Sequence, residues 1–289
     1  MRTYIKTSRR ELSLDNKPLI MGILNITPDS FSDGGAFFSA EKAVKRALEM
    51  EAEGADIIDI GGESTRPGSM PVSDEDEIKR VLPVIRELEQ KIKIPISIDT
   101  SKAKVAETCL SEGAEILNDI SGLRFDPQIA EVAASHSAAV VIMHTKSAPR
   151  VMQIETEYNY ILDDIASYLK IGIRKALDKG VDGKGIIIDP GIGFGKTREQ
   201  NLFIIKNLDW FHSLGYPVLI GTSRKSFIGT TLDVGVDERL EGSLAVDALV
   251  TLKGADIIRT HNVLATKRIV EMTQAIEESP ERERRQVGC

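Results

Sequence analysis

Eight short apolar runs recur along the chain, and each is followed by a polar or charged cluster. The segments between the runs repeat apolar residues at helical spacing, as in residues 39–53 and 263–277. Strand and helix alternating eight times is the pattern of a single (β/α)8 TIM barrel in the α/β class, whose chemistry lies at the carboxyl ends of the strands. The runs are LIMGIL before Asn25, ADIIDI before Gly61, PISI before Asp99, AEIL before Asn118, AAVVIM before His144, GIII before Asp189, VLIG before Thr222 and ADII before Arg259.

The two ends of the chain lie outside this pattern. Residues 3–14 alternate weakly around a turn-like Ser8-Arg9-Arg10 and predict an N-terminal β-hairpin, within residues 1–15, that plugs the barrel floor. Residues 279–289 are polar and predict a frayed tail. The chain has 289 residues, and a barrel of this kind needs about 250. We therefore expect one domain over residues 1–289, with its first helix capped by Ser39.

Composition excludes several classes of function. The net charge of -7 argues against nucleic-acid binding, which usually needs a basic face. No window approaches 18 apolar residues, so no membrane span is expected. Cys109 and Cys289 cannot build a disulfide or metal framework, which suits a reducing compartment. We expect a cytoplasmic protein.

Three hydrogen-bond acceptors follow three of the apolar runs: Asp99, Asn118 and Asp189. Each of them alone could cap the next helix or brace a loop, because a buried polar group needs a partner. Three such groups at one barrel mouth favour a binding role. Two carboxylates and an amide suit a flat heterocycle rich in N–H groups, such as a pterin or guanine edge.

A second set of residues is cationic or neutral and polar. Arg and Lys at a barrel mouth indicate an anion site, with phosphate the commonest anion. Solvated surface charge is the alternative for most basic residues, but Arg259 directly ends a strand. The set comprises Arg66, Lys225, Arg259 and His261, with Asn25, Thr65 and Ser226 as neutral neighbours.

Two loops and one histidine allow more than one interpretation. The loops at residues 25–35 and 61–71 are long and rich in Gly, Ser and Pro, which predicts lids, although passive surface loops remain an alternative. The segment IIIDPGIGFGKT resembles a phosphate-binding loop ending in Lys196, but Pro190 occupies the place of the first glycine, so that pattern is absent and the glycines indicate a tight turn after the sixth strand. His144 either lines the pocket or is a satisfied core histidine.

These motifs together resemble the dihydropteroate synthases over essentially the whole chain. The matching segments, in order, are MGILNITPDSFSDGG, DIGGESTRPG, SIDTSK, LNDISG, IMH, IDPGIGFGKT, GTSRKSFIG and IIRTHN. The resemblance implies a transferase of folate biosynthesis. Such an enzyme joins 6-hydroxymethyl-7,8-dihydropterin diphosphate to 4-aminobenzoate, uses Mg2+, is a sulfonamide target and is usually a homodimer.

The resemblance also implies roles for individual residues. The pterin is expected to contact Asp99, Asn118, Asp189 and Lys225, with Met143 as an apolar wall. The diphosphate is expected to contact Arg259, His261, Asn25 and Thr65, with Asn25 also touching Mg2+. The aminobenzoate pocket is expected to comprise Phe31, Pro67, Phe194 and Ser226, completed by Thr65 and Arg66.

One segment departs from the family pattern: Lys146-Ser147-Ala148 stands where the family commonly has a glycine-bearing stretch. Two other functions remain possible at this point. Pterin-binding methyltransferases share the acidic and amide contacts but lack the PDSFSDGG loop and the Arg-x-His pair. A non-catalytic paralogue is expected to have lost Asn25, Arg259 or His261, and the chain has all three.

Overall fold

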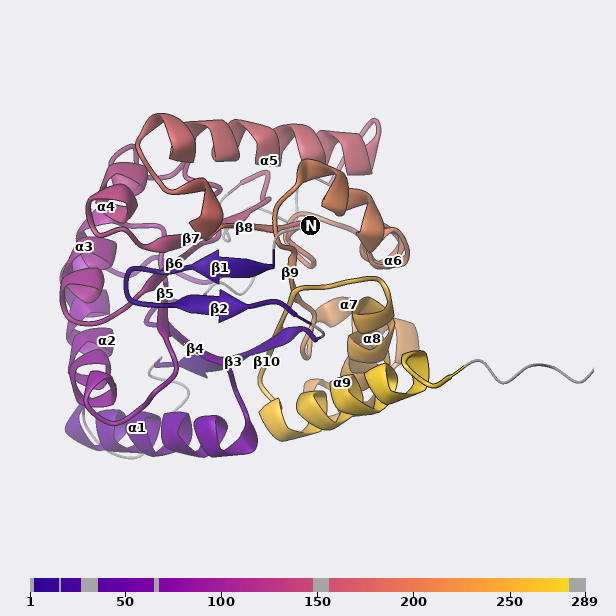
Figure 1. Ribbon diagram of the computed structural model, residues 1–289, viewed down its shortest axis with the longest axis horizontal. Helices are drawn as coiled ribbons and strands as arrows, with labels where there is room; N and C mark the ends of the chain where they lie inside the picture. The colour runs from indigo at the N-terminus through magenta and orange to yellow at the C-terminus, as the bar shows by residue number, and fades with distance from the viewer. Residues whose placement is uncertain (1–2, 16, 27–35, 65–67, 148–155, 281–289) are drawn as a thin grey trace, which may run out of the picture.

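The computed structural model describes residues 3–15, 17–26, 36–64, 68–147 and 156–280. Eight parallel strands form one sheet in the order β8-β7-β6-β5-β4-β3-β10-β9 (Figure 1). A parallel bridge between Ile188 and Val218 joins the two ends of the sheet, so the barrel closes. The strands are β3 (Leu19–Asn25), β4 (Ile57–Gly61), β5 (Ile96–Asp99), β6 (Ile116–Asp119), β7 (Ala139–Met143), β8 (Ile186–Asp189), β9 (Leu219–Gly221) and β10 (Ile257–Thr260). The predicted barrel is confirmed.

Helices surround the sheet, as Figure 1 shows. They are α1 (Ala36–Glu53), α2 (Asp74–Glu89), α3 (Ala103–Ser111), α4 (Ile129–Ser135), α5 (Ile161–Asp178), α6 (Arg198–Lys206), α7 (Ser226–Leu232), α8 (Leu240–Leu252) and α9 (Val263–Glu277), with 3-10 turns at Gly183–Gly185, Leu208–Leu214 and Val236–Glu238. The prediction that Ser39 caps the first helix is wrong, because α1 already begins at Ala36. Within the described ranges, no helix has the length and apolar character needed to cross a membrane.

Side chains that point into the barrel form layers across neighbouring strands. Residues paired in register on parallel strands point to the same face, and residues two apart on one strand share a face. Arg259 pairs with Met21 on one side and Gly221 on the other, and Met21 pairs with Ile57. Met21 and Ile57 belong to the buried cluster inside the barrel. Arg259 therefore starts from the inner face of the barrel.

The predicted N-terminal hairpin closes the barrel floor. It consists of β1 (Tyr4–Lys6) and β2 (Glu11–Ser13), which cross the barrel in Figure 1. Ile5 is fully buried in the same internal cluster as Met21 and Ile57. Glu115, just before β6, accepts a hydrogen bond from the Thr7 hydroxyl at 2.7 Å and pairs with Arg10 at 2.6 Å. Because the floor is sealed, the opposite end of the barrel is the one open to a ligand.

Candidate active site

The barrel mouth brings together acceptors and cations from five strands. Asp99 and Asp189 end β5 and β8, Asn118 is the penultimate residue of β6, and Arg259 lies near the end of β10. Lys225 follows β9 as the residue before α7. The carboxyl ends of parallel strands meet at one end of a barrel. The expectation that these residues share one mouth agrees with this placement.

One guanidinium connects the acidic and basic groups. Arg259 Nε donates to Asp59 Oδ2 at 2.6 Å, and Arg259 Nη2 donates to Asp99 Oδ2 at 2.8 Å. Asn118 Nδ2 donates to the same Asp59 oxygen at 3.0 Å. Two expected pterin contacts are therefore linked to Arg259, an expected diphosphate contact: Asp99 directly, and Asn118 through Asp59.

Asp59 is the residue of this network that the sequence analysis missed. It is fully buried, and its Oδ1 atom has no hydrogen-bond partner in the described part of the chain. It lies two residues before the end of β4, inside an apolar run rather than after it. The sequence did contain a sign of its role: a carboxylate within a buried apolar run requires a cation or hydrogen-bond donors nearby.

Two glycines, Gly61 and Gly221, lie next to the polar groups of the mouth. A Cβ added at Gly61 would lie 3.5 Å from Asn25 Oδ1 and 3.8 Å from Asp99 Oδ2. A Cβ added at Gly221 would lie 3.7 Å from Arg259 Cβ and 3.9 Å from Lys225 Nζ. The positions without side chains thus lie between polar groups, where a ligand can approach closely.

Lys225 faces the loop that follows β8. Its Nζ atom donates to the backbone oxygen of Ile192 and lies 4.8 Å from the centre of the Phe194 ring. Asp189 Oδ1 accepts from the backbone N–H of Gly191 at 2.7 Å. Phe194 is buried with Met143 and Ile120 in a small apolar cluster. Met143 of this apolar cluster and the acceptor Asp189 therefore come from the neighbouring strands β7 and β8.

Burial perturbs the ionisation of these groups. It raises the pKa of Asp99 to about 7, although the neighbouring Arg259 charge opposes the shift. It likewise raises the pKa of Asp189, against the opposing effect of Lys225. Burial lowers the pKa of Lys225 to about 8, against the attraction of Asp189. Perturbed ionisable groups gathered at one mouth are typical of a functional site.

Arg259 keeps its charge despite burial. Burial by itself lowers the pKa of its guanidinium, but Asp59 and Asp99 outweigh that effect, and the pKa is raised. A permanent cation therefore lies between two carboxylates.

The structure places the remaining predicted residues as follows. His261 follows β10, and both its backbone N–H and its ring Nδ1 contact the hydroxyl oxygen of Ser223, at 3.2 and 3.0 Å. Ser226 begins α7 with an exposed side chain. Phe31, Thr65, Arg66 and Pro67, and the tips of both predicted lids, lie outside the described residues.

His144, for which the sequence allows two interpretations, and Lys196 are both buried residues. His144 is 2% exposed and Lys196 is 4% exposed, and His144 Nδ1 lies 2.9 Å from Lys196 Nζ. Burial lowers the pKa of His144 to about 2, so its ring is neutral. Of its two interpretations, the satisfied core histidine is the one that this geometry supports.

Metal binding by protein groups alone has little support. In the described part of the chain, no three His, Cys, Asp or Glu side chains gather as a metal site. Asn25 offers one amide oxygen, close to Asp99 as judged from their common approach to Gly61. A hard cation that binds mainly through substrate phosphates needs only one or two such protein oxygens. The donor set therefore fits Mg2+ bound together with a diphosphate.

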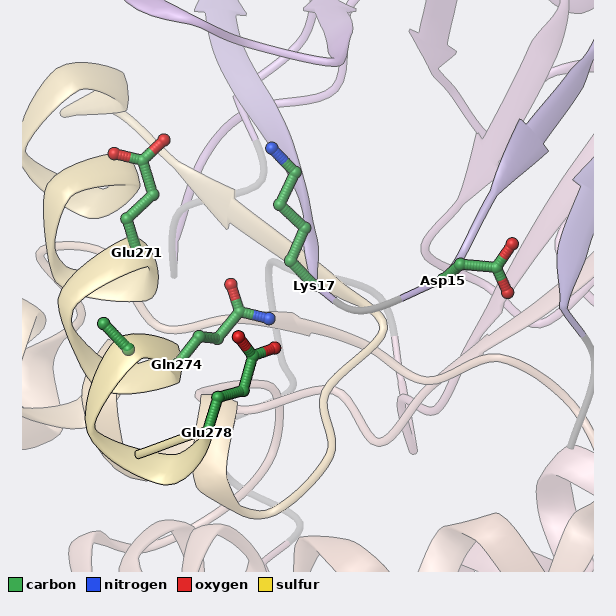
Figure 2. A pocket seen from close by; sticks show the side chains of 6 residues that line it. Asp15, Lys17, Glu271, Gln274 and Glu278 are labelled. Carbon is green, nitrogen blue, oxygen red and sulfur yellow. The ribbon is translucent and has the colours of Figure 1, made fainter. Parts of the chain in front are cut away.

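A pocket elsewhere on the surface is not part of this site. Figure 2 shows it between the residues that precede β3 and the last turns of α9. Lys17 comes before β3 begins at Leu19, so the pocket lies at the floor end of the barrel. Its lining is Asp15, Lys17, Glu271, Gln274, Ala275 and Glu278. None of the residues expected to bind the pterin, the diphosphate or the aminobenzoate lines this pocket.

Comparison with known proteins gives one consistent family. Residues 21–261 match the model of the pterin binding enzymes. A dihydropteroate synthase of Bacillus subtilis is 48% identical over 272 residues, covering 94% of this chain and 93% of the relative. The structure of a Yersinia pestis dihydropteroate synthase with a sulfonamide drug complex is 37% identical, with a TM-score of 0.90, covering 96% of this chain and 100% of the other. A Xanthomonas albilineans dihydropteroate synthase with 4-aminobenzoic acid matches with TM-score 0.90 and 37% identity, over 97% and 100% of the two chains.

Proposed function

The chain belongs to the pterin-binding enzymes and, within them, to the dihydropteroate synthases, and from that premise we propose how its barrel mouth works. The reaction is a transfer in folate biosynthesis. It condenses 6-hydroxymethyl-7,8-dihydropterin diphosphate with 4-aminobenzoate, giving 7,8-dihydropteroate and diphosphate. The observation that supports this assignment best is the Arg259 guanidinium, a cation at the barrel mouth that donates to Asp99, one of the acceptors suited to a pterin.

The pterin binds against Asp99, Asn118 and Asp189. Its ring N–H and amino groups are donors, and the two carboxylates and the amide oxygen are acceptors. Lys225 donates to the carbonyl side of the ring, and Met143 supplies an apolar wall. Pterin binding replaces the contact of Arg259 with Asp99, so the guanidinium is released toward the mouth while Asp59 still holds its Nε atom.

The diphosphate binds to Arg259, His261, Asn25 and Thr65. A guanidinium recognises phosphate oxygens through several N–H groups in one plane. Asn25 would hold Mg2+ through its amide oxygen, and the ion would neutralise charge on the diphosphate oxygens. The 4-aminobenzoate binds beside Phe194 and Ser226, with Phe31, Thr65, Arg66 and Pro67 completing the pocket. A sulfonamide, which resembles aminobenzoate, competes there.

Catalysis proceeds by charge stabilisation. The bond between the methylene carbon and the diphosphate oxygen breaks, and its electron pair leaves with the diphosphate, toward Arg259 and His261. Positive charge spreads into the pterin ring, where the carboxylates of Asp99 and Asp189 favour it. The amine lone pair of 4-aminobenzoate then attacks the methylene carbon, and the amine gives up one proton to solvent. No nucleophilic side chain takes part.

A diphosphate-release assay tests the proposal, with the pterin ester, aminobenzoate and Mg2+ omitted in turn. Diphosphate release is expected only when all three are present. Release without aminobenzoate would mean that another molecule, such as water, accepts the pterin group. Asp99→Asn and Asp189→Asn are each expected to lower turnover by about 10²-fold, because they remove charge that stabilises the cation. Lys104→Met is the control, because Lys104 pairs with Glu75 at the exposed surface. Near-normal turnover of both aspartate variants would refute the electrostatic role.

The protein acts as a cytoplasmic homodimer, and α8 supplies the surface for a second copy. Ala245, Leu249 and Leu252 recur at helical spacing on its outer face, where polar residues are usual, and Leu249 and Leu252 are 41% and 56% exposed. Light scattering at micromolar concentration is expected to give the mass of a dimer, and Leu249→Glu that of a monomer. A wild-type monomer would refute this arrangement.

A further inference from the structure

The loop after β8, residues 190–196, contains a lysine that the proposed reaction does not use. Lys196 resembles the lysine of a phosphate-binding loop, but its ammonium group is turned inward. Its Nζ atom donates to the backbone oxygens of Gly191 and Phe194, at 2.8 and 2.9 Å, and lies 2.9 Å from His144 Nδ1. Burial lowers the pKa of Lys196 well below its usual value. Its Nζ atom already has three partners within hydrogen-bond distance, so it is not available to a phosphate.

The loop needs an internal support because of its composition. Gly191, Gly193 and Gly195 all have positive φ, at 70°, 83° and 60°. Glycine loses more conformational freedom on folding than other residues, so three of them make this conformation costly to hold. A Cβ at Gly191 would lie 2.0 Å from the backbone oxygen of His144, so the loop is pressed against the end of β7. Lys196 joins the first and the last part of this glycine-rich loop.

The same loop contacts two groups of the proposed active site, Asp189 and Lys225, and contains a third, Phe194. The backbone N–H of Gly191 donates to Asp189, and the backbone oxygen of Ile192 accepts from Lys225. Phe194 presents its ring to Lys225. By contrast, Arg259 donates to Asp59 and Asp99, and His261 contacts Ser223, and none of these three partners belongs to this loop.

We propose that Lys196 is a positioning residue, which holds the 190–196 loop in the conformation that presents Asp189, Lys225 and Phe194 to the pterin. This inference rests on the proposed function. Burying a polar group costs free energy unless it is hydrogen-bonded, and an apolar residue of similar size would avoid that cost. We therefore assign the amino group of Lys196 the role of donating to the backbone oxygens of Gly191 and Phe194. His144 takes part as the neutral third partner.

The test separates the two halves of the substrate. Calorimetry measures binding of 6-hydroxymethylpterin, which lacks the diphosphate, and of inorganic diphosphate with Mg2+. Lys196→Met leaves two carbonyls without a donor and frees the loop, so affinity for the pterin is expected to fall about tenfold. Affinity for diphosphate is expected to stay within about twofold, because its proposed contacts lie outside the loop. A general loss of packing would weaken both ligands.

Lys175→Met is the matched control, because Lys175 likewise donates to a backbone oxygen, that of Leu123, which lies in the loop after β6 and not in the 190–196 loop. It is expected to leave both affinities unchanged. Unchanged pterin affinity in Lys196→Met, or equal loss of both ligands, would overturn the proposal. If Lys196→Met does not fold, His144→Phe decides: it removes one of the three partners and is expected to weaken pterin binding alone. Failure of the wild-type protein to bind either ligand would refute the proposed function instead.

Discussion

Removal of Arg259 is expected to destabilise the protein substantially, and the reason lies in the carboxylates it leaves behind. Asp59 is fully buried and Asp99 is 8% exposed, so Arg259→Met would strand two acids without a cation. Breaking a buried ion pair by removing one partner typically costs about 3–5 kcal/mol. The Arg259 side chain is 19% exposed, and Asp99 can take up a proton. We therefore expect the free energy of unfolding to fall by about 3 kcal/mol at pH 8.

Urea denaturation measures this loss. Far-ultraviolet circular dichroism and the fluorescence of the single tryptophan, Trp210, should give coincident transitions if unfolding is two-state. At pH 5.5 the loss should be smaller than at pH 8, because protonation of Asp99 then relieves part of the unpaired charge.

The double variant Asp59→Asn/Arg259→Met supplies the decisive comparison. The asparagine side chain would keep the shape of the buried aspartate and remove its charge, so the double variant should recover about 2 kcal/mol relative to Arg259→Met. A loss below about 1 kcal/mol for the single variant, or strictly additive effects in the double variant, would refute the stranded-charge explanation.

Three further predictions concern single residues. Burial raises the pKa of Asp99 from 3.8 to about 7, so the folded state binds this proton more tightly than the unfolded chain does. The free energy of unfolding should therefore rise as the pH falls from above 7 toward 4, and Asp99→Asn should flatten that rise in urea titrations. Lys102 donates to Glu63, at 2.7 Å, and to the backbone oxygen of Val72, at 2.6 Å, which flank the loop carrying residues 65–67. Lys102→Met should raise KM for 4-aminobenzoate about tenfold, whereas Lys104→Met should not; equal KM values would contradict the anchoring role. Burial raises the pKa of the Cys109 thiol to about 12, so the thiol is protonated at pH 8. In a Cys289→Ser background, a thiol reagent should therefore react only after unfolding. Rapid reaction of the native protein would show that the helix α3 opens.

The sequence was sufficient for the barrel because each strand run is short, apolar and terminated by a chemically distinct residue. Those terminal residues, Asp99, Asp189 and Arg259 among them, are also the ones that meet at the mouth. Helix starts were harder to predict. Ser73 does cap α2, since its hydroxyl accepts from the backbone N–H of Asp76, whereas Ser39 lies inside α1. A serine before an apolar stretch predicts a cap only when the preceding residues cannot continue the helix.

The interior contacts were beyond the sequence, because they depend on which residues of distant strands share a layer. Asp59 and Arg259 are 200 positions apart in the chain, and they meet only because the barrel closes. Lys196 shows the reverse case: its local motif suggests a phosphate contact, and three-dimensional packing gives its donors to the loop instead.

The central ion cluster explains how one mouth can receive both a flat heterocycle and an anion. In the structure, Asp99 and Arg259 satisfy each other, so neither charge is buried without a partner before substrate arrives. Asp59 pairs with Ser97, two residues before Asp99, so it lies deeper in the barrel, and it holds Arg259 through Nε while Nη2 donates to Asp99. In the proposed reaction, the pterin replaces the contact between Arg259 and Asp99, the diphosphate takes up the released guanidinium nitrogens, and Asp59 still holds Nε. Charge that is already oriented requires little reorganisation when the leaving group develops its own charge, which is the condition under which electrostatic stabilisation accelerates bond cleavage most.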